Sequence, residues 1–160
     1  MTTQRKTPAS RIKDTDVLWQ ILDLLPTSLF VKDENLNCVF SNEAHGKVSG
    51  SEAEKLLGLS DADFYPREQA EKFLAADKSV LNSPEAREFL ELATSTDGST
   101  IYSLTRKARV VTSDGATYLI GSNTDVTEMK NNEIELEAKE AAGIALGRII
   151  GFDRLLHLTG

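Results

Sequence analysis

A single stretch decides the fold: Ser28-Leu29-Phe30-Val31-Lys32-Asp33-Glu34-Asn35-Leu36-Asn37-Cys38-Val39-Phe40-Ser41. Its two ends, residues 28–32 and 38–41, are rich in apolar and β-branched side chains and predict strands. Asp33-Glu34-Asn35 between them predicts a turn, so the two strands pair as a hairpin. Both strands are apolar on both faces, which is typical of strands covered by other elements.

Three further strands are predicted downstream, at residues 88–94, 100–112 and 117–125. Asp97-Gly98 and Asp114-Gly115 stand between them, and Asp-Gly favours a hairpin because glycine accepts a positive φ angle. Hairpins before and after a helical middle segment indicate one antiparallel sheet. The predicted fold class is therefore α+β: a five-stranded antiparallel sheet with short helices covering one face and a small cavity between them.

Helical signals occur in the middle segment and at both ends of the chain. Asn42 is a predicted cap for a helix that runs towards Val48, and Pro66 fits the start of a longer helix over residues 66–82. Apolar residues at helical spacing predict two flanking helices, the second running from Thr127 to about Ile150. The predicted organisation is a flexible tail over 1–13, an N-terminal flanking helix over 14–25, a globular domain over 26–126, and a C-terminal helix and linker over 127–160.

Composition narrows the classes of partner. The chain of 160 residues has a formal net charge of −7, and an acidic surface repels phosphates, which predicts no nucleic-acid partner. Cys38 is the single cysteine, so no intrachain disulfide can form. The apolar run over 141–152 is interrupted by Arg148 and is too short for a bilayer core of roughly 30 Å. We therefore expect a cytoplasmic segment without membrane contact.

Four segments, in this order, resemble the PAS family of sensory domains. They are residues 25–33 (LPTSLFVKD), 39–42 (VFSN), 58–66 (GLSDADFYP) and 120–128 (IGSNTDVTE). Each is short and none is specific by itself, but the order and spacing together match the family. The resemblance covers about residues 14–130.

The resemblance implies a non-catalytic sensory and dimerisation module of a bacterial signal-transduction protein, of histidine kinase or diguanylate cyclase type. PAS domains bind small molecules between sheet and helices, form homodimers through flanking helices, and relay changes along the exit helix to a downstream output domain. We expect this chain to be a piece of such a longer protein. Asp125 and Thr127 match the junction between the last strand and the exit helix. A carboxylate there can cap the helix, so these residues cap the helix, relay the signal, or do both.

Candidate ligand-binding residues are Arg106, Tyr102, Tyr118 and Phe73. Strand alternation places Arg106 and Tyr102 on one face. If that face lines the cavity, the guanidinium needs an anionic partner, and the ligand is acidic. The alternatives are an internal salt bridge and a register that turns Arg106 to solvent.

No cofactor, metal site or catalytic set is predicted, so the chain is not expected to be an enzyme. Asn37-Cys38 superficially resembles the Asn-Cys pair of flavin-binding LOV photoreceptors, but their cysteine opens a helix and Cys38 falls in a predicted strand. Haem-binding PAS domains often take a histidine from the long helix, whereas His45 and His157 lie elsewhere. A haem or flavin sensor and a structural dimeriser without ligand remain as alternatives.

Overall fold

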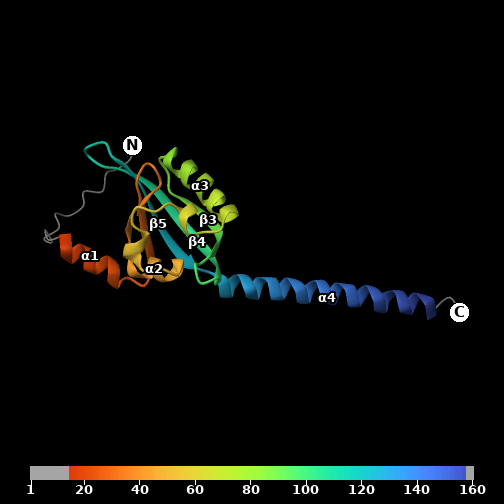
Figure 1. Ribbon diagram of the computed structural model, residues 1–160. Coiled ribbons are helices and arrows are strands. Elements are labelled where there is room, and N and C mark those ends of the chain that lie inside the picture. The colour runs from red at the N-terminus through yellow and green to blue at the C-terminus, as the bar shows by residue number, and fades with distance from the viewer. Residues whose placement is uncertain (1–14, 158–160) are drawn as a thin grey trace. The chain divides into compact units, whose positions relative to one another are not determined.

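The computed structural model describes residues 15–157, so the predicted tail over 1–13 lies outside the described residues. The helices and strands follow in chain order: α1 Thr15–Leu24, β1 Ser28–Lys32, β2 Cys38–Ser41, α2 Glu43–Ser49, η1 Ala53–Leu56, η2 Asp61–Asp63, α3 Arg67–Leu81, β3 Arg87–Thr94, β4 Thr100–Val111, β5 Thr117–Asp125 and α4 Thr127–His157. Both η elements are short 3₁₀ helices. Figure 1 shows the strands in the middle of the domain, with α3 running alongside β3 and β4.

The strands form one antiparallel sheet in the order β2-β1-β5-β4-β3, which confirms the predicted fold class. β1 pairs antiparallel with β2 on one side and with β5 on the other, and β3 pairs antiparallel with β4. The central strand β5 therefore lies between β1 and β4, which come from opposite ends of the domain sequence.

Local interactions explain why the helical segment starts and stops where it does. Asn42 caps α2 by accepting a hydrogen bond from the His45 amide at 3.0 Å, as the sequence predicts. Gly50 ends α2 in the left-handed conformation, with φ of 70°, which glycine adopts without steric cost. Pro66 stands immediately before the first residue of α3, where its missing amide hydrogen is not needed.

One face of the sheet is turned towards the helices, and it carries polar as well as apolar side chains. Phe30, Leu36, Val80 and Leu119 form a buried apolar cluster at its centre. β4 contributes Ser103, Thr105 and Lys107 to this interior, all of them buried. On the other face of β3 and β4 lie Leu90, Leu92 and Leu104, which are exposed. The interior is therefore more polar than the sequence pattern indicates.

The residues from Asp125 onwards form a second compact unit, whose helix α4 runs to His157 and thus beyond the predicted end near Ile150. Its apolar residues Ile144, Leu146 and Ile149 are exposed. Asp125 Oδ1 accepts a hydrogen bond from the Thr127 amide at 2.9 Å, so this carboxylate satisfies one of the free amides at the start of α4. No helix in the described part of the chain is long and apolar enough to cross a membrane.

Candidate functional site

Five charged side chains meet inside the domain, between the sheet and the helices. They come from five different elements: Lys32 of β1, Asp61 of η2, Asp77 of α3, Glu91 of β3 and Lys107 of β4. We call this group the buried ion network. The network joins segments that are far apart in the sequence, so these five side chains come together only when the domain folds.

The contacts within the network are short. Lys32 Nζ lies 2.6 Å from Asp61 Oδ2 and 2.6 Å from Asp77 Oδ2. Lys107 Nζ lies 2.7 Å from Asp77 Oδ1 and 2.7 Å from Glu91 Oε1. The contact with Asp77 Oδ1 is ionic and lacks hydrogen-bond geometry. Asp77 therefore bridges the two lysines.

Burial makes this network energetically demanding. The side chains of Lys107 and Asp77 are 2% and 1% exposed, and that of Lys32 is 7% exposed. Removing such charges from water costs several kcal/mol per ion, which pairing only partly offsets. Aromatic rings add support, because Lys107 Nζ lies 5.3 Å from the ring centre of Phe89 and 5.8 Å from that of Phe73. Two ammonium groups face three carboxylates, which gives the network a formal charge of −1.

Electrostatics keep Lys32 charged and His45 neutral. Burial acts to lower the pKa of Lys32, but the charges and hydrogen bonds of Asp61 and Asp77 outweigh it and raise this pKa above its usual value. Burial, with a further contribution from the charge of Lys32, lowers the pKa of His45 to about 4. His45 Nδ1 lies 2.8 Å from Ser41 Oγ, and its ring packs on Phe30. A neutral imidazole therefore lies beside the network at pH 7.

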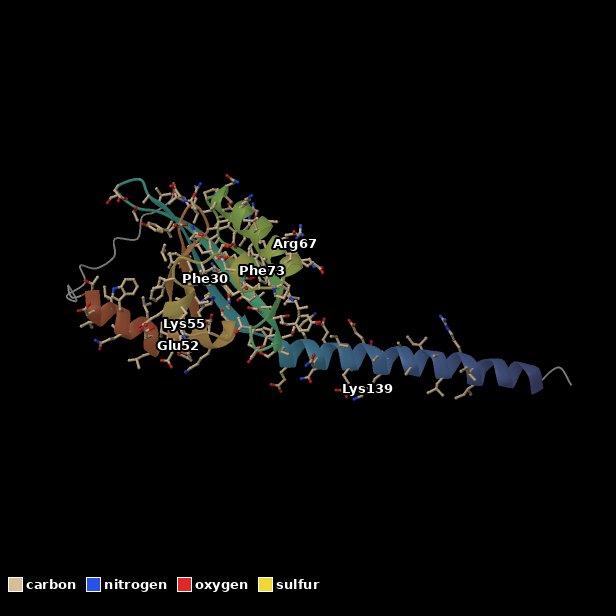
Figure 2. The ribbon with its side chains drawn as sticks, viewed as in Figure 1. Phe30, Glu52, Lys55, Arg67, Phe73 and Lys139 are labelled. Atoms are coloured by element: carbon tan, nitrogen blue, oxygen red, sulfur yellow. The ribbon has the colours of Figure 1, made fainter. Side chains whose placement is uncertain are left out.

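A cavity of about 30 Å³ lies next to the network, with His45, Ser103, Thr105 and Asn123 in its wall. Asn123 Oδ1 is buried and has no hydrogen-bond partner within the described residues. A space of this size and polarity suits about one water molecule. Figure 2 shows Phe30 and Phe73, which also line the cavity, in the interior of the domain, whereas Arg67 lies on the outer side of α3.

A larger pocket opens outside the network. It has a volume of about 480 Å³ and lies between the β1–β2 turn, η2 and α3. Leu36, Ala70 and Leu74 supply apolar walls, and Asp61 contributes a partly exposed acidic side chain. Asp61 lines both this outer pocket and the inner cavity, so the two spaces share one wall.

The structure brings one of the four predicted ligand-binding residues to the inner cavity. Phe73 is buried there. Arg106 lies on the opposite face of the sheet, exposed, with Nη1 3.3 Å from Glu88 Oε1, which corresponds to the alternative of a solvent-facing register. Tyr102 follows the same alternation and lines a groove between α3 and β3. Tyr118 is half-buried and precedes the interior residue Leu119, so alternation places it on the outer face.

The sequence did carry a signal for the ion network. Ser103, Thr105 and Lys107 alternate along β4, just as Tyr102 and Leu104 do on the other face. The more apolar of two such faces is normally the interior one, and that rule selects the wrong face here. Asp77 sits on the apolar stripe of α3 between Phe73 and Val80, and a charge at such a position predicts a buried partner.

Cys38, one of the residues weighed for cofactors, is not among the residues that line the inner cavity. Cys38 is buried in β2, its thiol donates to the Phe40 carbonyl at 3.3 Å, and burial raises its pKa. His157 lies at the end of α4, where its side chain is outside the described residues. Among the residues whose placement is described, no cluster of His, Cys, Asp and Glu is arranged to hold a metal ion.

Comparisons with known proteins agree with this fold. The family model described as PAS fold matches residues 22–131. The uncharacterized protein y4lL of Sinorhizobium fredii is 29% identical over 121 residues, a match that covers 74% of this chain and 15% of that protein. The chain therefore spans a small part of its curated relative.

Solved structures are similar at lower identity. An RNA-binding Light-Oxygen-Voltage receptor has a TM-score of 0.69 at 21% identity, with 86% of this chain and 41% of that chain covered. The Vibrio cholera VqmA–ligand–DNA complex has a TM-score of 0.64 at 22% identity, over 74% of this chain and 54% of that chain. A PAS domain from a two-component sensor histidine kinase has a TM-score of 0.59 at 12% identity, over 69% of this chain and 95% of that chain. At these identities the likeness is one of fold.

These structures correct one prediction. The exclusion of a nucleic-acid partner is wrong, because VqmA, which contains a domain of this fold, is solved in complex with DNA. The match covers 54% of the VqmA chain, and at 22% identity the likeness is one of fold. The net charge of −7 describes the surface of this chain and does not decide the partners of a protein that contains it.

Proposed function

Because this chain belongs to the PAS fold family, whose model matches residues 22–131, we propose that it is a sensory and dimerisation module without catalytic activity. It binds a small molecule between the sheet and the helices and relays the change through α4. The parent protein is a cytoplasmic signal-transduction protein of histidine kinase or diguanylate cyclase type. The fold likeness to a PAS domain from a two-component sensor histidine kinase supports this setting.

The buried ion network carries the proposal. A domain that needs only stability is served as well or better by apolar side chains, because replacing buried ion pairs with apolar groups is often neutral or stabilising. Here five ionised groups converge beside a cavity instead. They come from β1, η2, α3, β3 and β4, so a ligand that altered these pairs would act on both layers of the domain.

Exposed apolar side chains on the flanking helices support the homodimer. Every residue of α1 is at least partly exposed, including Val17, Leu18 and Ile21. α4 exposes Ile144, Leu146 and Ile149 along its length. Apolar surface of this extent on single helices is normally covered by a partner.

We propose that the module works without haem or flavin. The inner cavity of about 30 Å³ is far smaller than the roughly 300–1,000 Å³ of cofactor and other small-molecule sites, so a haem or flavin does not fit into it. Cys38, the residue of the Asn-Cys pair, does not line that cavity. A purified chain should therefore show no absorbance band in the visible range, and such a band would contradict this part of the proposal.

Ligand binding is tested by thermal shift of the 160-residue chain against a library of small polar metabolites, with native mass spectrometry of the purified protein. We expect at least one compound to raise the melting temperature in a saturable way, because a ligand of the native state stabilises it by mass action. A ligand larger than water enters the inner cavity only when the pairs of the ion network move apart, so Ala93→Val, which narrows that cavity, should weaken the shift. Ala108→Val on β4, outside the cavity wall, serves as the matched control. A shift equal in both variants would argue against binding in the inner cavity.

A further inference from the structure

The Lys32–Asp61 ion pair separates two spaces in this domain. Asp61 lines the outer pocket of about 480 Å³ and also the inner cavity of about 30 Å³. Lys32 lines the inner cavity but not the outer pocket, and its Nζ lies 2.6 Å from Asp61 Oδ2. The carboxylate therefore has one face towards Lys32 and another towards the outer pocket, and its side chain is 14% exposed.

The outer pocket has the size and the walls of a small-molecule site. Its volume lies within the range of roughly 300–1,000 Å³ that is usual for such sites. Leu36, Ala62, Ala70 and Leu74 form apolar walls from the β1–β2 turn, η2 and α3. A ligand with an apolar body is therefore desolvated on several sides there.

Charge at the inner end of the pocket favours a cation. Asp61 lines the pocket with a side chain that is 14% exposed, whereas Lys32 and Lys107 do not line it. The network as a whole has one carboxylate more than it has ammonium groups. At the mouth, Arg67 is exposed and paired with Glu71 at 2.9 Å, so its charge is already offset. A single positive charge added at Asp61 would bring the network to neutrality.

We propose that the outer pocket binds a small organic cation, an ammonium group on an apolar body, which contacts Asp61 in competition with Lys32. The inference rests on the proposed sensory function and names its class of ligand, and it places that ligand in the outer pocket instead of the inner cavity. Lys32 keeps Asp77 at 2.6 Å when Asp61 turns to the ligand, so no buried ammonium is left unpaired. Asp61 opens η2, a three-residue 3₁₀ helix whose capping box with Ser60 and Asp63 does not involve Asp61. Movement of Asp61 joins the outer pocket to the inner cavity.

The experiment compares three probes of one shape and different charge: phenethylamine, 2-phenylethanol and phenylacetate. Isothermal titration calorimetry on the 160-residue chain should show saturable binding of the amine, with the alcohol at least tenfold weaker and the carboxylate weakest. Asp61→Asn should weaken the amine at least tenfold and leave the alcohol unchanged. Glu54→Gln removes an exposed carboxylate of η1 and serves as the matched control for charge.

A second pair of variants tests the place of binding. Ala62→Phe fills the outer pocket from an exposed position on η2, and it should abolish amine binding without unfolding the domain. Ala75→Phe places the same side chain at an exposed position of α3 outside the pocket and should bind as the parent chain does. Circular dichroism confirms that each variant is folded.

The outcomes separate this inference from the proposed function. Equal affinity for amine and alcohol, unchanged binding in Ala62→Phe, or no amine binding at millimolar concentration would each overturn the cation site. A neutral or anionic metabolite found in the library screen, with an effect lost in Ala93→Val, would still support the sensory function. If neither the calorimetric titration of the amine nor the library screen showed binding, both the cation site and the sensory function would be contradicted.

Discussion

Asp77 of α3 touches both buried lysines of the sheet: its Oδ2 lies 2.6 Å from Lys32 Nζ and its Oδ1 2.7 Å from Lys107 Nζ. Lys32 belongs to β1 and Lys107 to β4, and the central strand β5 separates these two strands. One helical carboxylate thus holds α3 against strands on both sides of the sheet centre.

Asp77→Ala should destabilise the domain by about 3–5 kcal/mol, because it leaves buried ammonium charges without their shared partner. Urea unfolding followed by circular dichroism measures this free energy of unfolding. Lys78→Ala, at the next and exposed position of α3, should stay within about 0.5 kcal/mol of the parent chain. A loss below about 1 kcal/mol in Asp77→Ala would contradict the role assigned to this carboxylate.

Protonation of His45 should destabilise the domain in acid. Its pKa falls from 6.5 in the unfolded chain to about 4 in the fold, so the unfolded state binds more protons between these values. Stability from this residue is complete above pH 6.5 and decreases as the pH falls towards 4, by on the order of 3 kcal/mol in total.

The measurement is the free energy of unfolding from pH 7.5 to 4 for the parent chain and for His45→Gln. Glutamine can still meet Ser41 but does not titrate, so the variant should show a flatter profile over this range. Identical slopes in the two proteins would show that carboxylates, and not His45, set the acid response.

Gly121 and Phe30 should behave as a coupled pair. They face each other across β5 and β1, and a Cβ atom at Gly121 would lie 2.1 Å from Phe30 Cζ. Gly121→Ala should therefore cost about 1–3 kcal/mol through overpacking. The double variant Phe30→Leu/Gly121→Ala should lose about 1 kcal/mol less stability than the two single variants lose together, which a double-mutant cycle measures. Gly143→Ala in α4, with no atoms close to its Cβ position, should cost nothing. If the stability losses of the two single variants were strictly additive, the Phe30 ring would not be held against Gly121.

Asn42 should control the docking of α1. Its side-chain amide donates to the carbonyls of Leu22 and Thr27 at 3.0 and 2.9 Å, and its oxygen accepts from the amides of Leu29 and His45. Asn42→Asp keeps the acceptor and loses the donor, so we expect a loss of about 1–3 kcal/mol.

Trp19, the single tryptophan, reports this change because its ring packs on Phe40 with ring centres 4.8 Å apart. Its fluorescence emission should move to longer wavelength in Asn42→Asp and remain unchanged in Asn35→Asp, an exposed position of the β1–β2 turn. An unshifted emission would mean that α1 stays docked without these two hydrogen bonds.

The sheet could be predicted from the sequence because its signals are local. The predicted strands 28–32, 38–41 and 117–125 coincide with β1, β2 and β5, and Asn42 caps α2 through its own neighbours. Hairpin turns with glycine and the helix cap each depend on a few consecutive residues. Such features do not require knowledge of the tertiary structure.

The interior of the domain could not be predicted in the same way. Lys32 and Lys107 have partners that lie far away in the sequence, with Asp77 separated from Lys32 by 45 positions. Alternation along β4 defined two faces correctly but could not tell which face meets the helices, since the outer face carries Tyr102 and Leu104. The same ambiguity makes Arg106 a candidate for the cavity and leaves the ion network unpredicted.

The burial of the network also determines how the domain responds to ionic strength. Surface pairs such as Lys47–Glu43 are open to counter-ions, which screen charges over about 8 Å in physiological salt. The pairs around Asp77 are closed to solvent, so dissolved ions do not reach them. Raising the salt concentration therefore weakens the exposed pairs along α2 and α3 while the hold of α3 on the sheet persists.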